Sequence, residues 1–375
     1  MRPRPAMSTT FRIVDVINTA ASAKEILLDR ALHFHHPPAV ENWIVCNAGD
    51  HVDQIRRAGI PVAVIDTPRG LDPAALMRAT WHLARFFRRC KPDLVHTVHG
   101  FHFHRGSLLP SRMLSWAAER SLAFFTDMLL TQNHEDLRVV RRWPRVRARC
   151  IGNGIDAERY ARAAHPHAGP GRVIACIARF EAVKNHHDLL HVFARVHAAC
   201  PQARLRLIGD GPLRPACERL AADLGIAAAM EFTGYREDVD RLLADVDVAA
   251  LLSWKEGLPR GLLEPMAAGI PVVAWRVKGN REVIRPGQSG LLAAPGDLAE
   301  TAAHVVRLLQ DPALRARLGG AAAERVHRRF AETAVVARLR DTYGSLLREA
   351  GYVLPAHWHP HHAAQSHDQR TVLSA

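Results

Sequence analysis

The feature that most constrains the fold is the alternation, along most of the chain, of short aliphatic or β-branched runs with longer segments of helical spacing. Short runs of this composition are typical of strands, and the apolar spacing between them indicates helices. Strands that alternate with helices form a parallel sheet with helices on both faces. The sequence therefore predicts an α/β protein built from doubly wound, Rossmann-like sheets.

A loop rich in Ala, His, Pro and Gly follows Tyr160 and divides this alternation into two series. A length of 375 residues is also too great for one ordinary core and fits two domains. We predict an N-terminal domain, a C-terminal domain, a helix that packs back toward the N-terminal domain, and a flexible His-rich tail. These cover residues 1–160, 161–335, 336–350 and 351–375.

The first series predicts strands at 11–17, 42–46, 62–66, 93–101 and 127–131, with helices at 23–33, 52–58, 73–89 and 109–124. The second predicts strands at 172–178, 204–212, 230–235, 246–253, 271–275 and 289–293. Its helices are expected at 187–199, 214–224 and 239–244, before Gly269, and at 297–309 and 331–349. Ligands of such sheets bind at the carboxyl ends of the strands, so functional residues are expected just after each strand.

The chain is strongly basic, with 50 Lys and Arg against 37 Asp and Glu and a formal net charge of +13. This charge favours phosphates, nucleic acid or an anionic membrane face as partners. Because helix-turn-helix, zinc-finger and RNP-like patterns are absent and the arginines are spread along the sequence, we expect no nucleic-acid partner. The helix at 73–89 sets arginines beside Trp81, Phe86 and Phe87, which is typical of an interfacial helix. The alternative is an amphipathic helix that packs Phe86 on the sheet.

The six cysteines are scattered without a CxxC pair, and we interpret them as small buried hydrophobic residues. Neither disulfides nor a zinc site is therefore expected. No apolar run approaches the roughly 18 residues that span a bilayer. The N-terminus lacks an apolar signal segment. We therefore expect a cytoplasmic protein, at most peripheral at the inner face of the plasma membrane, and predict no particular oligomeric state.

The densest group of polar residues follows the apolar run at 246–252 and extends to Gly269. Because proline is tolerated in the first turn of a helix, Pro265 places the predicted helix start near 261–263, with Gly269 as its C-cap. Glu264 would then lie in the first turn and Glu256 in the preceding loop. The open N–H groups of residues 261–263 could bind a diphosphate, and the two carboxylates could accept hydrogen bonds from a sugar and a ribose. The alternative is that both acids are only favourable charges near a helix N-terminus.

Two cations support the binding interpretation. Arg179 and Lys184 follow the first strand of the same half, so they are expected to face the same crevice and to suit a diphosphate leaving group. The pairs Asp245–Asp247 and Asp238–Asp240 have the spacing of a metal-binding Asp-x-Asp motif. Because both pairs precede a strand instead of following one, we interpret them as polar residues at element ends.

With these motifs the chain resembles the GT-B family of retaining glycosyltransferases called family 4. The matching features are Glu256-x7-Glu264, Arg179-x4-Lys184, the loop 209–212, the run 232–239 and Pro271-Val-Val-Ala, which together cover about 170–345. The resemblance implies a GT-B fold, a nucleotide-sugar co-substrate with UDP favoured, no cofactor, no required metal, and retention at the anomeric carbon.

The resemblance also implies roles for individual residues. Arg179 and Lys184 would bind the diphosphate and stabilise its developing charge, which makes them and Glu256 catalytic candidates. Glu264 would bind the ribose, and Tyr235 with Arg236 the edge of the base. The remaining implied donor contacts are Gly209, Gly257, Leu258, Pro259, Arg260, Gly261 and Leu262. No enzymic nucleophile is evident, so the implied mechanism is a front-face displacement in which the leaving phosphate can deprotonate the acceptor hydroxyl.

In the N-terminal half, His99-Gly-Phe-His-Phe103 resembles a segment of the subset that builds capsule, exopolysaccharide or lipid-linked glycans. The first histidine of that segment reaches the donor sugar, which makes His99 a further catalytic candidate. A structural role for His99 is the alternative. His102 and His104 share one strand face and are expected to pack or to line the acceptor cleft.

Two features depart from the family pattern. The family has a helix and a strand between the segment at 93–97 and the His-Gly motif, whereas here the two are directly joined. Parallel strands need a crossover of a dozen or more residues, so 93–101 is expected to be a single strand and the N-terminal domain shorter by one helix and one strand. The usual glycine-rich turn after the first strand is replaced by residues 18–23.

The leading hypothesis is an enzyme that transfers a hexose or N-acetylhexosamine from a nucleotide sugar to a glycan or lipid-linked acceptor. One alternative is a degenerate relative that binds a nucleotide sugar without turnover, because its acceptor domain is short. Another is a different GT-B enzyme, such as a sugar-nucleotide 2-epimerase.

Overall fold

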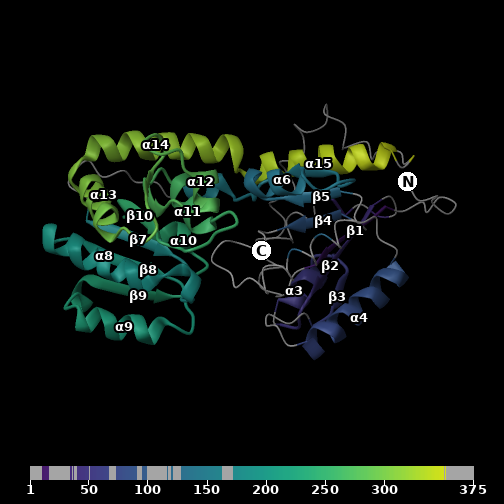
Figure 1. The fold of residues 1–375 in the computed structure, drawn as a ribbon, viewed down its shortest axis with the longest axis horizontal. Coiled ribbons are helices and arrows are strands. Elements are labelled where there is room, and N and C mark those ends of the chain that lie inside the picture. Colours follow the sequence, from purple (N-terminus) through teal and green to yellow (C-terminus); the bar gives the residue numbers. More distant parts are fainter. Residues whose placement is uncertain are drawn as a thin grey trace.

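The computed structural model of the chain describes residues 11–16, 34–35, 37, 40–49, 51–66, 73–90, 95–98, 116, 120, 128–162, 172–349 and 351. Two α/β halves lie side by side, and the two long C-terminal helices α14 and α15 run along one edge of both (Figure 1). The predicted α/β class with parallel sheets is confirmed.

The described part of the N-terminal half forms two three-stranded parallel sheets, in the orders β1-β2-β3 and β4-β5-β6. Their strands are β1 (Phe11–Val16), β2 (Val40–Cys46), β3 (Val62–Val64), β4 (Val95–Val98), β5 (Met128–Thr131) and β6 (Ala148–Cys150). The helices are α3 (Val52–Arg57), α4 (Pro73–Cys90), α6 (His134–Val140) and α7 (Ala157–Ala161). The predicted strands at 11–17, 42–46, 62–66 and 127–131 and the helices at 52–58 and 73–89 are confirmed.

Other predictions for this half concern residues that the structure does not describe. The segments 23–33, 93–94 and 99–101 lie outside the described residues, and of 109–124 only Trp116 and Arg120 are described. The shortened N-terminal domain therefore stays a prediction. The sequence did not predict α6, β6 or α7, which are short elements of three to seven residues.

The C-terminal half has one six-stranded parallel sheet in the order β12-β11-β10-β7-β8-β9. Its strands are β7 (Val173–Ile177), β8 (Arg204–Ile208), β9 (Met230–Gly234), β10 (Val248–Leu251), β11 (Val272–Trp275) and β12 (Leu291–Ala293), all as predicted. Strands β10 and β11 are buried at every position, as central strands covered on both faces must be. The strand order reverses between β7 and β10, and ligands of open α/β sheets bind at this switch point.

The helices of this half cover both faces of the sheet. They are α8 (His186–Ala199), α9 (Arg214–Asp223), α10 (Val239–Leu242), α11 (Arg260–Ala267), α12 (Lys278–Val283), α13 (Leu298–Gln310) and α14 (Pro312–Arg329), with one-turn 3-10 helices at Ala182–Lys184 and Ala227–Ala229. Neither α12 nor α14 was predicted. The chain enters α14 through Asp311, whose side chain accepts from the Leu314 N–H, and Pro312 occupies the first turn.

The last helix, α15 (Glu332–Glu349), belongs to the core of the N-terminal half. Its buried residues Leu339, Tyr343 and Leu347 join one hydrophobic cluster with Ile13 and Met128 of β1 and β5. The chain therefore returns from the C-terminal half to complete the N-terminal one, and the segment between α14 and α15 connects the two.

The start of α11 differs from the prediction. The helix begins at Arg260, with Pro259 as its extended N-cap, because the N–H groups of Leu262 and Leu263 both donate to the Pro259 carbonyl at 3.1 Å. Pro265 consequently lies inside the helix, and Glu264 lies beyond the first turn. The predicted end is confirmed, since Gly269 has a φ of 73° and donates to Met266 while Ile270 donates to Pro265, as in a Schellman motif.

Candidate active site

The candidate site is the crevice at the switch point, between the loops that follow β7 and β10. The two loops are tied together by backbone and side-chain bonds: the Trp254 N–H donates to the Val183 carbonyl at 2.9 Å, and Asn185 Nδ2 donates to the Leu252 carbonyl at 3.3 Å. Asn185 has a φ of 55°, a conformation that asparagine tolerates better than most residues. The loops therefore form one connected unit.

The central contact of this unit joins two predicted site residues. Lys184 Nζ donates to Glu256 Oε1 at 2.7 Å, although 72 residues separate them in sequence. The Glu256 side chain is almost fully buried, and that of Lys184 is a quarter exposed. A carboxylate so removed from water needs a charged partner, and the lysine supplies it. The structure thus brings the Arg-x4-Lys and Glu-x7-Glu motifs into direct contact.

Arg179 lies at the outer side of the same loop. Its side chain is 60% exposed and forms an ion pair with Glu181 at 2.9 Å. Exposed pairs of this kind contribute little stability, so the guanidinium can exchange Glu181 for a stronger anionic ligand at small cost. Of the two predicted diphosphate-binding cations, Lys184 is therefore held in place and Arg179 is adjustable.

Two glycines set how closely the backbone segments approach at the switch point. A Cβ on Gly261 would lie 2.2 Å from the Ile177 carbonyl oxygen, so only glycine lets α11 start directly on the end of β7. Gly209 has a φ of 140°, and a Cβ there would lie 2.2 Å from the Ala178 carbonyl oxygen. The predicted site residue Gly209 thus lets the loop after β8 pack against the segment that leads to Arg179.

The anion-binding prediction for the start of α11 is partly wrong. The N–H groups of Leu262 and Leu263 are bonded to Pro259, so they are not open to a ligand. The N–H of Gly261 has no acceptor among the described residues. One of the three predicted donors therefore remains, at the junction of α11 and β7.

Glu264 lies on the second turn of α11 and is buried. Its Oε1 accepts from Arg260 Nε at 3.2 Å across one helical turn. Tyr160 of α7 is also buried, and burial first and the Glu264 charge second raise the pKa of its hydroxyl group. Glu264 is thus a buried carboxylate whose nearby cation, Arg260, is itself one of the predicted donor contacts.

Tyr235 and Arg236 follow β9, two strands from β7 at the same edge of the sheet. Tyr235 is 61% exposed, whereas the described Tyr160 and Tyr343 are buried. Arg236 binds both carboxylate oxygens of Asp238 at 2.7 Å each. The structure therefore places these two residues at the rim of the sheet's carboxyl edge, outside the Lys184–Glu256 contact.

Sequence reasoning missed a contact that the N-terminal half makes with the loop that carries Glu256. Lys278 Nζ donates to the buried Asp136 of α6 at 2.6 Å, and Asn133 Nδ2 lies 2.7 Å from Asp136 and 3.4 Å from the Gly257 carbonyl. Burial first, and then the Lys278 charge, lower the pKa of Lys255 in the same loop. The only local signal was Asn133, an N-cap residue two positions after the end of the buried strand β5.

His99 lies outside the described residues, as do His102 and His104. The described residues contain no group of three or more His, Cys, Asp or Glu side chains that could hold a metal ion. The Asp-x-Asp carboxylates make protein contacts instead. Asp245 binds Arg206, Asp240 binds Arg159, and Asp247 accepts the N–H groups that lead into β7.

Comparison with known proteins agrees with this geometry. Residues 158–325 match the family model described as Glycosyl transferases group 1. The putative glycosyltransferase EpsD of Bacillus subtilis (strain 168) is 30% identical over 277 residues, which cover 70% of this chain and 72% of EpsD. The lipopolysaccharide core biosynthesis glycosyltransferase LpsE of Rhizobium meliloti (strain 1021) is 34% identical over 175 residues, 47% of this chain and 49% of LpsE.

Among solved structures, Anabaena HepE in complex with UDP and glucose superimposes with a TM-score of 0.73. The match covers 90% of this chain and 99% of HepE at 18% sequence identity. At this identity the likeness is one of fold.

Proposed function

This chain belongs to the group 1 glycosyltransferases, and from that premise we propose that it transfers a hexose or N-acetylhexosamine from a nucleotide sugar to a glycan or lipid-linked acceptor. Its two Rossmann-like halves have the predicted GT-B fold. The proposal rests above all on the contact between Lys184 and Glu256, because it sets a cation and a carboxylate side by side at the switch point where α/β sheets bind ligands.

The donor would be a UDP-sugar, since a protein of the same fold is known with UDP and glucose bound. Lys184 and Arg179 would bind the diphosphate and stabilise the charge that develops on it as the glycosidic bond breaks. The N–H of Gly261, which has no acceptor among the described residues, would donate to a phosphate oxygen. Arg179 and Lys184 come from the loop after β7, and Gly261 lies in the first turn of α11, which follows the loop after β10.

The other proposed contacts are those to the sugar, the ribose and the base of the donor. Glu256 would accept hydrogen bonds from the sugar hydroxyls, with the backbone of Gly257 and Leu258 beside it. Glu264 would accept from the ribose, and Tyr235 with Arg236 would border the base. His99 would reach the donor sugar from the N-terminal half. Pro259, Arg260 and Leu262 shape the start of α11 between these subsites, and Gly209 positions Arg179.

We propose retention of the anomeric configuration by front-face displacement, in which the leaving phosphate takes the proton of the acceptor hydroxyl. No metal would be needed, because Lys184 and Arg179 provide the positive charge that a metal supplies elsewhere. The Lys278–Asp136 contact would hold α12, and the Asn133–Gly257 contact the Glu256 loop, against the N-terminal half, where the acceptor is expected to bind.

The test is to incubate the protein with UDP-glucose, UDP-galactose and UDP-N-acetylglucosamine, with and without a crude bacterial lipid and glycan extract, and to measure UDP release. We expect release that depends on the extract and resists EDTA. Nucleotide binding without extract-dependent release would favour the degenerate binding protein, and interconversion of the sugar on free UDP-sugar would favour the epimerase.

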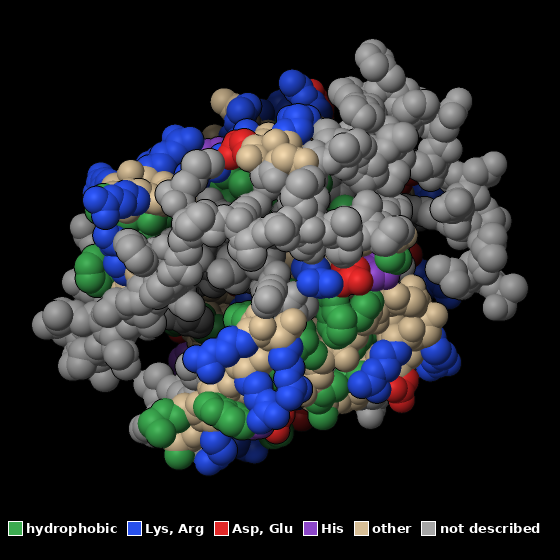
Figure 2. Space-filling view, turned by 90° about the vertical axis from the view of Figure 1, so that its right-hand side faces the viewer, with side chains coloured by type: hydrophobic (Ala, Val, Ile, Leu, Met, Phe, Trp, Pro, Cys, Tyr) green, Lys and Arg blue, Asp and Glu red, His purple; other side chains and the backbone are tan. Residues whose placement is uncertain are grey.

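A second proposal is attachment to an anionic membrane through α4. One face of this helix packs inward, where Phe86 meets Trp43 in an edge-to-face contact at 5.8 Å. The other face exposes Met77 (73%) and Trp81 (57%), and Arg85 lies over the Trp81 ring at 5.5 Å. Figure 2 views this side of the molecule and shows Lys and Arg side chains intermixed with hydrophobic ones on its lower part. None of the described helices is long and apolar enough to cross a membrane.

Vesicle sedimentation tests this attachment. We expect salt-sensitive binding to vesicles that contain phosphatidylglycerol, loss of that binding in Trp81→Ala, and none to phosphatidylcholine alone. Binding that ignores lipid charge would contradict the proposal. Leu213→Ala, which removes an exposed hydrophobic side chain before α9, serves as the control for the loss of exposed apolar surface.

A further inference from the structure

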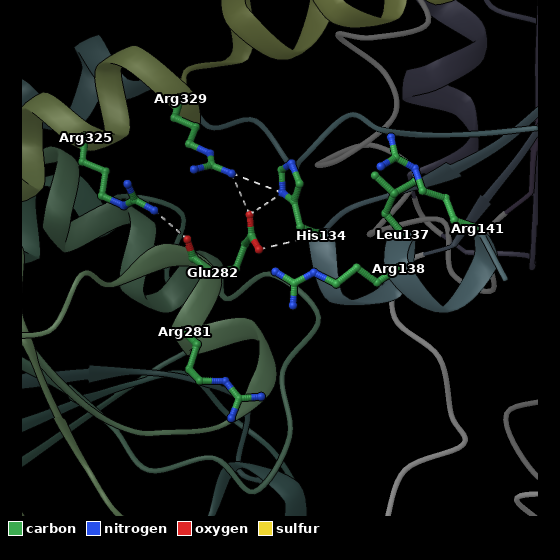
Figure 3. A pocket seen from close by; sticks show the side chains of 8 residues that line it. All are labelled: His134, Leu137, Arg138, Arg141, Arg281, Glu282, Arg325 and Arg329. Atoms are coloured by element: carbon green, nitrogen blue, oxygen red, sulfur yellow. Dashed lines mark hydrogen bonds and ion pairs between the residues drawn. The ribbon is translucent and has the colours of Figure 1, made fainter.

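A second concave site lies between the two halves, outside the switch-point crevice. It is a pocket of about 350 Å³ between α6 of the N-terminal half and α12 and the end of α14 (Figure 3). Its lining residues are His134, Leu137, Arg138, Arg141, Arg281, Glu282, Arg325 and Arg329. Five guanidinium groups thus surround one carboxylate, which gives the pocket a net positive charge.

Two of these arginines are fixed around Glu282 by bonds within the C-terminal half. Arg325 donates to the Glu282 and Val283 carbonyl oxygens at 2.8 and 2.6 Å, and Arg329 donates to the Glu282 carboxylate at 3.0 Å. The same carboxylate lies 2.8 Å from His134 Nδ1 of α6. The single acid of the pocket is therefore already shared by two partners and cannot neutralise the other arginines.

Arg281 crosses between the halves, since its guanidinium binds both carboxylate oxygens of Glu135 at 2.8 and 3.1 Å. Arg138 and Arg141 differ, because neither guanidinium group has a hydrogen-bond or ion-pair partner among the described residues. In Figure 3 the Arg138 side chain extends from α6 toward α12, on which Arg281 lies. Arg138 lies in the last turn of α6 and Arg141 is the C-cap residue of the same helix, so both come from its C-terminal end.

The positive charges of the arginines in this pocket repel one another. Burial first, and then the charges of Arg329 and Arg285, lower the pKa of Arg325 to about 10, while Glu282 acts in the opposite direction. The basic surface also continues into an adjoining hollow of about 270 Å³, which shares Arg141 and adds Arg149 and Arg338, with Asp341 as its only acid among the described residues. Like charges gathered in a partly buried site repel each other unless an anion separates them.

We propose that this pocket binds a compact anion with two linked phosphate groups, and that the bound anion ties α6 to α12 and α14. Guanidinium groups bind phosphate oxygens through paired N–H donors, and arginines on facing helices suit a diphosphate better than a single carboxylate. The volume is at the lower end of the range for small-ligand sites, which fits an ion of this size. The anion can be free diphosphate or the headgroup of a diphosphate-bearing lipid.

The test is calorimetric titration with inorganic pyrophosphate in the presence of saturating UDP, which fills the proposed donor site. Arg138→Gln with Arg141→Gln should weaken pyrophosphate binding by at least about tenfold, because two charge-assisted contacts are lost. Arg195→Gln with Arg219→Gln removes two exposed arginines of α8 and α9, outside the pocket, and pyrophosphate binding should stay within about twofold of the parent, as expected for distant surface charges. A second arm measures sedimentation of the same variants with phosphatidylcholine vesicles that carry a polyprenyl diphosphate.

The proposal is supported if the variant with Arg138→Gln and Arg141→Gln loses binding while the control variant does not. Loss in the pyrophosphate titration identifies a free diphosphate as the ligand, and loss in the vesicle experiment identifies a lipid headgroup. The proposal is overturned if the pocket variant binds both probes as the parent does, or if the control variant loses as much. UDP titrations of the same proteins distinguish an effect on the proposed donor site from an effect on the pocket. Failure of UDP binding counts against the donor site, whereas the pyrophosphate result concerns only the pocket between α6, α12 and α14.

Discussion

Replacing Lys184 by alanine probes the candidate site at its central contact, and it should affect stability and nucleotide binding through different partners. The lysine neutralises the buried Glu256 carboxylate at 2.7 Å. Loss of one partner from a fully buried ion pair costs about 3–5 kcal/mol. Because the Lys184 side chain is a quarter exposed and water can partly screen the remaining charge, we expect about 1–3 kcal/mol of lost unfolding free energy.

The effect on ligand binding has a separate origin. If Lys184 binds the diphosphate, its removal should weaken UDP binding by about 1.5–3 kcal/mol, roughly 10- to 150-fold, which is the usual range for a hydrogen bond to a charged group. Urea unfolding gives the first quantity and isothermal titration with UDP the second. Arg219→Ala, an exposed arginine of α9, should change neither.

The double variant Lys184→Ala with Glu256→Gln separates the two effects. Glutamine carries no charge, so the stability that Lys184→Ala loses should be largely recovered, while UDP binding should remain weak. The reasoning is refuted if Lys184→Ala binds UDP within about twofold of the parent, since a charge-assisted contact is worth more than that. It is also refuted if the double variant is no more stable than Lys184→Ala.

Three further predictions concern other residues of the same half. Glu264→Gln should weaken the binding of UDP more than that of pyrophosphate in titrations of both ligands, because the ribose contact is lost. Equal losses of affinity would contradict the role of Glu264 in ribose binding. Gly261→Ala should lower the thermal midpoint and abolish UDP binding, because its Cβ would lie 2.2 Å from the Ile177 carbonyl oxygen. A variant with parental stability would show that α11 can move away from β7. His186 is buried against Phe180 at 4.2 Å, and burial first and Lys184 second lower its pKa to about 4. The unfolded chain takes up this proton near pH 6.5 and the folded chain only near pH 4. Lowering the pH from 7 to 4.5 should therefore lower the unfolding free energy by about 2–3 kcal/mol. His186→Phe should lessen the fall, as measured by urea unfolding at pH 7 and pH 4.5, and an unchanged fall would assign it to other groups.

The sequence predicts the C-terminal sheet well because four of its six strands, β7, β10, β11 and β12, are unbroken apolar runs. The same runs identify the carboxyl ends where Lys184 and Glu256 come into contact, so the two motifs could be placed at one site before their distance was known. The direct ion pair between Lys184 and Glu256 could not be predicted. Residues 72 positions apart interact only once the order of β7 and β10 in the sheet is known.

Helix α14 shows how tertiary packing can override a local pattern. Its start is signalled by Asp311 and Pro312, yet Gly319 and Gly320 in its interior disfavour a helix. Gly319 is needed there because a Cβ would lie 1.9 Å from the Gly269 carbonyl at the end of α11. The start of α11 was placed too late for a related reason, since the rule that keeps proline out of helix interiors did not hold for Pro265.

The contact between the halves could not be predicted locally. Lys278 and Asp136 are 142 residues apart, and α12, which carries Lys278, was not predicted. Nor did any motif point to the arginine-lined pocket, because its side chains come from three helices that meet only when α15 returns to the N-terminal half. The basic composition predicted an anionic partner, but it did not predict where on the protein that partner binds.

The most direct measurement for the candidate site is a crystal structure of the full chain with UDP bound. We predict a diphosphate within hydrogen-bond distance of Lys184 Nζ and the Gly261 N–H, with the ribose at Glu264. We also predict that Arg179 turns from Glu181 to the phosphate. UDP bound away from the β7 and β10 loops, or a diphosphate there without contact to Lys184, would contradict this assignment of the donor site.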